Sequence, residues 1–125
     1  MKVNEKSKKS QDIITIGIMG NNEGFINKII EIGKIAGEKF WELPMWQEYR
    51  DNMDSDIADM KNTGTRYGGA SAAGMFLKEF VTDNVKWVHL DIAGTAFLEK
   101  PQKEFFCNGS TACGVRTLVK YILEQ

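Results

Sequence analysis

A histidine and an aspartate two positions apart are the residues of this sequence whose types most directly suggest chemistry. His89, the only histidine, lies with Asp91 in the apolar run 87–92. Side chains at alternate positions of a β-strand point to the same face, so the two would lie together. A histidine and a carboxylate can bind a metal or transfer protons. Because no second group of ligands accompanies them, a hydrogen-bonded core histidine is the favoured interpretation, and the functional one stays open.

Three aspartates close together, Asp54, Asp56 and Asp59, suggest a cation site. A calcium loop of the EF-hand type needs glycine at its sixth position and glutamate at its twelfth. Asp59 and Thr65 occupy those positions here. Roles in turns and helix caps are therefore favoured over metal binding.

The glycine-rich stretch 62–70 leads into a predicted helix and carries Arg66. Free backbone N–H groups at a helix start can hold an anion. The stretch lacks the Gly-Lys-Ser/Thr ending of a P-loop and the spacing of a dinucleotide turn. Tight backbone packing is the favoured role of its glycines, and an anion site is the alternative.

The two cysteines do not point to a metal or a redox motif. Cys107 and Cys113 lack CxxC spacing, and we expect two free thiols. No serine or cysteine has an obvious base partner, so nucleophilic catalysis receives little support.

Composition limits the classes of partner. The chain has 125 residues, 42% of them hydrophobic and 26% charged, and a formal net charge of -1. This balance recruits neither nucleic acid nor an acidic membrane. The polar leader 1–11 lacks the apolar core of a secretory signal, and no apolar run is long enough to span a bilayer. We expect a disordered leader, a domain over 12–125 and a cytoplasmic protein.

Hydrophobic periodicity predicts an α/β fold. The expected elements are strands over 12–19 and 87–92, helices over 25–37, 70–80 and 114–123, a short helix after Pro44, and a loop over 95–110. A sheet of two strands is only marginally stable, and the sequence predicts that both strands are buried on two faces. The pattern therefore indicates an incomplete piece of a three-layer α/β/α arrangement.

Read together, several stretches resemble the cytosol (leucyl) aminopeptidase family in collinear order. They are GIMGNN at 17–22, GEKFWELPMW at 37–46, SDIADMKN at 55–62, KEF at 78–80, WVHLDIAGTA at 87–96 and GSTACGVRTL at 109–118. The resemblance covers nearly all of the chain from Asp12 onward and corresponds to the C-terminal part of the family's catalytic domain.

The resemblance implies a hydrolase that removes N-terminal residues, leucine among them, from peptides. Family members use two divalent metals (zinc, manganese or magnesium) and assemble as hexamers. Their metal-binding lysine and aspartates, their Asn-Thr-Asp-Ala-Glu-Gly-Arg motif and their Leu-Thr-Gly turn have no counterpart here. We therefore expect no catalytic residue, no metal ligand and no cofactor in this chain. By the resemblance, Ala93, Gly94 and Ala96 form a substrate-pocket wall, bordered by Asn62 and Gly64.

These expectations lead to three hypotheses on the function of the chain. The first is an aminopeptidase fragment that is inactive alone; the second is one half of a split enzyme, which would bind peptide once an upstream segment completes it. The third is a non-catalytic partner within a homo- or hetero-oligomer of aminopeptidase subunits. Because strands upstream complete the sheet in the family, we expect the isolated chain to be marginally stable, self-associated or partly molten.

Overall fold

The computed structural model describes residues 15–64, 66–99 and 108–125. The leader 1–11, Thr65 and Cys107 lie outside these residues, as does part of the predicted loop 95–110. The chain divides into two compact units. The first comprises the chain up to residue 16 with 29–41 and 91–125, and the second comprises 17–28 with 42–90. The division passes through three strands and one helix.

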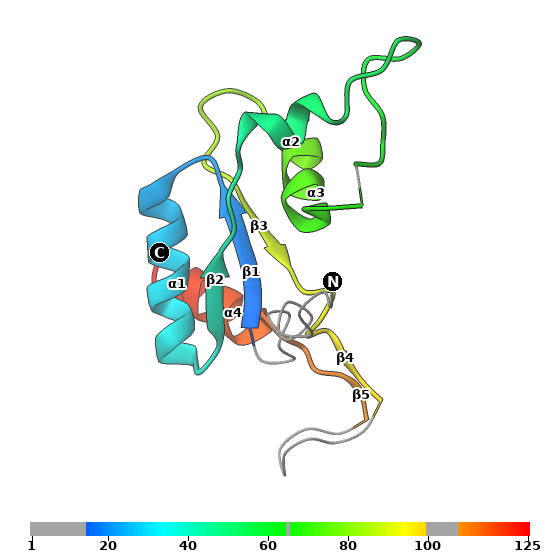
Figure 1. Ribbon diagram of the computed structural model, residues 1–125. Coiled ribbons are helices and arrows are strands. Elements are labelled where there is room, and N and C mark those ends of the chain that lie inside the picture. Colours follow the sequence, from blue (N-terminus) through cyan, green and yellow to red (C-terminus); the bar gives the residue numbers. More distant parts are fainter. Residues whose placement is uncertain (1–14, 65, 100–107) are drawn as a thin grey trace, which may run out of the picture. The chain divides into compact units, whose positions relative to one another are not determined.

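A three-stranded sheet contains β1 (Thr15–Gly20), β2 (Lys39–Glu42) and β3 (Val88–Asp91) in the order β2-β1-β3. Helix α1 (Glu23–Ala36) connects β1 to β2, which run in the same direction, while β3 runs in the opposite direction (Figure 1). The expected α/β class is therefore confirmed, as a piece of mixed helices and strands.

The start and end of α1 follow from its flanking residues. Asn22 caps the helix, because its Oδ1 accepts a hydrogen bond from the Phe25 N–H at 2.8 Å. Gly37 ends the helix in the left-handed region, with φ of +77°. Between them the buried side chains recur at helical spacing: Ile26, Ile29 and Ile32. The predicted cap and stop are confirmed.

In the second unit, the side chain of Asn21 ties the end of β1 to the segment entering β3. Its Nδ2 donates to the Val85 carbonyl and its Oδ1 accepts from the Trp87 N–H, both at 2.8 Å. The backbone N–H of Asn21 also donates to the Trp87 carbonyl. The amide side chain thus continues the strand pairing beyond the last residue of β1.

Helices α2 (Gln47–Asp51) and α3 (Gly69–Lys78) belong to the same unit and match the predicted short helix and the helix over 70–80. The Arg50 guanidinium joins them, with Nε 3.1 Å from a carboxylate oxygen of Glu79 just past α3. On α3, a Cβ added to Gly74 would lie 2.7 Å from the sulfur of Met19. The small residues of this helix therefore permit close packing on β1.

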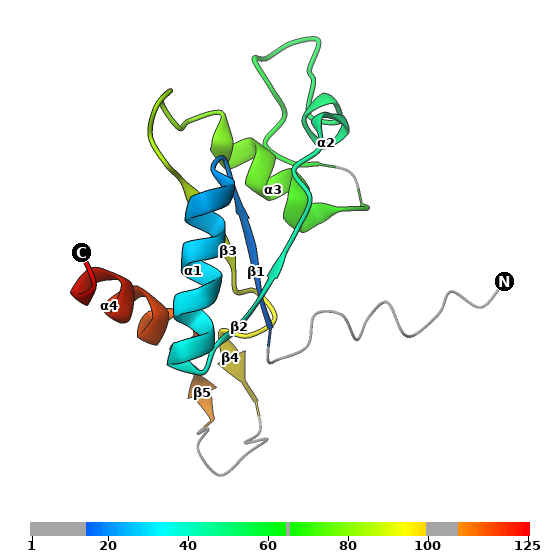
Figure 2. The ribbon, with the colours of Figure 1, turned by 90° about the vertical axis from the view of Figure 1, so that its left-hand side faces the viewer.

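The first unit contains β4 (Phe97–Leu98), β5 (Gly109–Ser110) and α4 (Val115–Leu123). The two short strands pair antiparallel, with Phe97 opposite Ser110. Helix α4 lies beside the C-terminal half of α1 in both views (Figures 1 and 2). The helix predicted over 114–123 is confirmed.

A buried carboxylate holds α4 in place. Glu38 is 7% exposed, and its Oε1 accepts a hydrogen bond from the Gly114 N–H at 2.8 Å. Its Oε2 accepts from both the N–H and the hydroxyl of Thr117, a fully buried residue. Gly114 has no side chain with which to cap α4, so Glu38 satisfies free N–H groups of its first turn from a distant part of the sequence.

Two expectations need correction. The sequence predicted two strands, but β2 makes a third; it was missed because its four residues include the charged Lys39 and Glu42 and three of them are exposed. The expectation that β3 is buried on both faces is also wrong, since all four of its residues are half-buried. In addition, β4 and β5 interrupt the predicted loop.

We predict that Glu38→Ala destabilises α4 locally by about 2 kcal/mol, because it leaves three buried donors without an acceptor. Amide hydrogen exchange in α4 should then accelerate roughly 30-fold. Hydrogen–deuterium exchange of the peptide covering α4 measures this directly, whether or not the whole chain unfolds cooperatively.

The matched control is Glu31→Ala, which removes an exposed carboxylate from α1. It should leave exchange in α4 within about twofold of the unsubstituted chain. Equal exchange in both variants would contradict a capping role for Glu38.

Candidate functional site

The predicted pocket wall lies on a tight turn that follows β3. The N–H groups of Thr95 and Ala96 both donate to the Ile92 carbonyl, at 2.9 and 2.8 Å. Asp91 Oδ1 accepts from the Ala93 N–H at 3.1 Å. These bonds fix the backbone of 91–96. The small side chains of the turn follow Ile92, which is 38% exposed, with Ala93 exposed and Ala96 half-buried.

Buried Thr95 anchors this turn to the segment that enters α4. The Thr111 hydroxyl donates to the Thr95 carbonyl, and the Thr111 N–H donates to the Ala96 carbonyl at 3.0 Å. The Thr95 hydroxyl lies 3.0 Å from the sulfur of Cys113, which is a free thiol. The position of Ala93, Gly94 and Ala96 therefore depends on the chain just before α4.

Asn62 and Gly64 belong to the other unit, in the loop that precedes α3. Asn62 is exposed and Gly64 is half-buried. That these two border the same cavity as Ala93–Ala96 stays a prediction.

Close packing explains two of the three glycines of the stretch 62–70, whereas a Cβ on Gly69 would meet nothing within 4 Å. A Cβ on Gly64 would lie 2.8 Å from the Cβ of Ala72, and one on Gly68 would lie 2.4 Å from the Tyr49 ring. Gly68 also has a φ of +69°, which favours glycine. Arg66 is exposed to solvent. The favoured packing role is supported for Gly64 and Gly68.

His89, Asp91 and Asp54 contact other residues of the chain. The His89 ring stacks on Trp87, with 6.2 Å between ring centroids, and Asp91 accepts the turn hydrogen bond described above. Asp54 pairs with Arg50 at 2.7 Å, while Asp56 is exposed. Across residues 15–64, 66–99 and 108–125, no three His, Cys, Asp or Glu side chains are grouped so that they could hold a metal ion.

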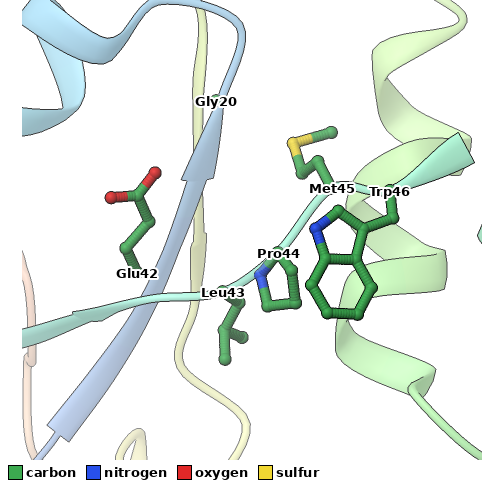
Figure 3. Close-up of a pocket in the computed structure, with 6 residues that line it drawn as sticks. All are labelled: Gly20, Glu42, Leu43, Pro44, Met45 and Trp46. Carbon is green, nitrogen blue, oxygen red and sulfur yellow. The ribbon is translucent and has the colours of Figure 1, made fainter.

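A hollow of about 480 Å³ in the second unit was not foreseen from the sequence. Its lining residues come from the end of β1, the last residue of β2 and the segment that follows it: Gly20, Glu42, Leu43, Pro44, Met45 and Trp46. In Figure 3, Glu42 and Met45 extend toward the Gly20 side of this segment, whereas Leu43 and Trp46 extend away from it. None of the predicted pocket-wall residues lines this hollow. A single carboxylate among apolar side chains offers no acid–base pair or metal site.

The sequence of this chain is similar to that of known proteins. Residues 10–119 match the model of the cytosol aminopeptidase family, catalytic domain. A probable cytosol aminopeptidase of Gloeobacter violaceus is 49% identical over 109 residues, which are 87% of this chain and 21% of that protein. One of Aquifex aeolicus is 46% identical over 88% of this chain and 22% of its own. The chain thus spans about a fifth of the length of these relatives.

Solved structures give the same result. A mutant of tomato leucine aminopeptidase matches 98% of this chain and 23% of its own, with a TM-score of 0.82 and 33% identity. The bottromycin maturation enzyme BotP, in complex with Mn, matches 98% of this chain and 27% of its own, with a TM-score of 0.86 and 28% identity. The match to the family model over most of the sequence is decisive: this chain belongs to the cytosol aminopeptidase family and corresponds to a C-terminal piece of its catalytic domain.

Proposed function

We propose that this chain supplies the C-terminal part of the catalytic domain of a metal-dependent aminopeptidase, and that it needs further residues for activity. The proposal rests on the difference between the share of this chain and the share of its relative that are matched. Most of the chain matches the catalytic-domain model, while the alignment to the Gloeobacter violaceus relative spans only 21% of that protein. Residues outside this segment, on the same polypeptide or another, would complete the enzyme.

The residues described here do not fit the metal pair that the family implies. Mn accompanies the BotP relative, and two divalent metals activate water and polarise a carbonyl in enzymes of this kind. The described part of this chain brings together no group of three His, Cys, Asp or Glu side chains that could serve as ligands. We therefore assign metal binding to residues outside the segment and no reaction step to its own side chains.

The contribution of this chain is the wall of the pocket for the first side chain of a peptide. Ala93, Gly94 and Ala96 lie on a turn whose backbone is held by the Ile92 carbonyl and by Thr111. Small side chains on a fixed backbone leave room for a branched apolar group such as that of leucine. Asn62 and Gly64 border the same pocket in this proposal.

The alternatives concern what completes the enzyme. One is a split aminopeptidase, in which this chain and a separate metal-binding chain form the active site. The other is a non-catalytic subunit within an aminopeptidase oligomer. We place either form in the cytoplasm, in keeping with the relatives' description as cytosol aminopeptidases. No helix among the described residues has the length and apolar character needed to cross a membrane.

We predict that the purified chain does not hydrolyse leucyl p-nitroanilide when Mn²⁺ or Zn²⁺ is supplied. Hydrolysis should emerge when the chain is coexpressed with the part of the Gloeobacter violaceus relative that precedes the matched region, because that part would bring the missing ligands. The complex of the two is the completed enzyme. Turnover by the chain alone that survives repurification would contradict the proposal.

A second test concerns the pocket wall. In the completed enzyme, Ala96→Phe should lower kcat/KM for a leucyl substrate at least about tenfold relative to an alanyl substrate, since lost space penalises the larger side chain. Ala58→Phe, at an exposed position in the other unit, is the matched control and should keep the ratio. An unchanged leucyl-to-alanyl ratio in Ala96→Phe would remove this residue from the pocket.

A further inference from the structure

Helix α4 carries an apolar face that points to solvent. The side chains of this α4 apolar face are between 44% and 80% exposed: Val115, Leu118, Val119, Ile122 and Leu123. They recur at spacings of three and four residues and so form one continuous stripe. An amphipathic helix of a globular protein normally turns such a stripe inward.

The orientation of α4 is set by its polar side. Thr117 is the buried residue of the helix, and it contacts the Glu38 carboxylate. At 100° per residue, Thr117 lies opposite the centre of the apolar stripe. The buried hydrogen bonds therefore turn the stripe away from the unit that holds the helix, and it cannot reach that unit's core without breaking them.

The charges beside the stripe are already paired within the chain. Lys120 Nζ lies 2.9 Å from Glu124, and Arg116 Nε lies 3.6 Å from Glu38. With both cations neutralised, the face is suited to an apolar protein surface rather than to phosphates of a membrane or a nucleic acid. Contiguous exposed apolar stripes mark interaction sites, and the paired charges favour a protein as the partner of this one.

We propose that the α4 apolar face is the docking surface for the remaining part of the aminopeptidase catalytic domain. This inference rests on the proposed function and names the surface through which the enzyme is completed. The tomato structure matches 98% of this chain with only 23% of its own length, so most of a family member's chain is available as the occupant. The occupant must present an apolar surface complementary to the stripe.

The test uses the tagged chain coexpressed with the preceding part of the Gloeobacter violaceus relative. We expect the two to copurify in equal amounts, and Ile122→Asp and Ile122→Lys each to reduce the recovered partner at least about tenfold. Because lysine suits the last turn of a helix better than aspartate, the second variant separates docking from helix loss, and circular dichroism checks that α4 persists. Ile57→Asp makes the same change at a side chain that is 97% exposed, outside α4, and should retain the partner.

Three outcomes would overturn the proposal. The first is failure of the unsubstituted chain to capture the partner. The second is capture by both Ile122 variants at the unsubstituted level. The third is a dimer of this chain that Ile122→Asp dissociates while partner capture is unaffected, since the occupant would then be a second copy.

Leucyl p-nitroanilide hydrolysis separates this inference from the proposed function. A complex that depends on Ile122 but lacks hydrolysis with Mn²⁺ supports the docking surface and contradicts the function. A complex that hydrolyses the substrate equally well with Ile122→Lys supports the function and contradicts the docking surface.

Discussion

The hydrogen bonds of the Glu38 carboxylate hold the C-terminal helix α4 in place. Glu38 follows the glycine that ends α1, and it caps α4 through Gly114 and Thr117. The segment just before α4 contains Thr111 and Cys113, which contact Thr95 in the turn after β3. One buried carboxylate thus fixes a helix, and the helix fixes the backbone that presents the small residues of the proposed pocket wall. Burying an acid is favourable here because each of its oxygens has a donor.

The same interaction explains why the molecule exposes so much apolar surface. Hydrophobic burial alone would turn the apolar stripe of α4 inward, but Thr117 takes the inward position. In the proposed complex, the remaining part of the catalytic domain would cover the stripe. The half-buried strand β3, at one end of the three-stranded sheet, is a second place where this piece of the fold has an open side. Both features agree with a segment that spans about a fifth of its relatives.

Local signals allowed much of the fold to be predicted from the sequence. Asn22 and Gly37 marked the ends of α1, and the glycines at 64 and 68 were correctly assigned to close packing. The strand β2 escaped prediction because it is short and exposed. The hydrogen bonds between Glu38 and Thr117 could not be predicted from the sequence. They join residues 79 positions apart, and no local pattern indicates such a contact.

The candidate site was harder to predict from the sequence than the fold. Composition and spacing favoured structural roles for His89 and the aspartates, and the structure gives partners within the chain to His89 and Asp54. Ala93 and Ala96 carry no chemical signal of their own, so only the family resemblance drew attention to them. The hollow beside Glu42 was missed because its walls come from two segments that meet only in the folded chain.

The central claim is that the metal site of the proposed completed enzyme is formed by residues outside the segment. Metal content tests it most directly: the purified chain is dialysed against Mn²⁺ or Zn²⁺, freed of excess metal and measured by mass spectrometry of its bound metals. The account predicts less than about 0.1 equivalent per chain, because residues 15–64, 66–99 and 108–125 bring together no three His, Cys, Asp or Glu side chains that could hold an ion. One or two equivalents retained per chain would contradict it, since a metal site would then exist among the residues assigned here to structure.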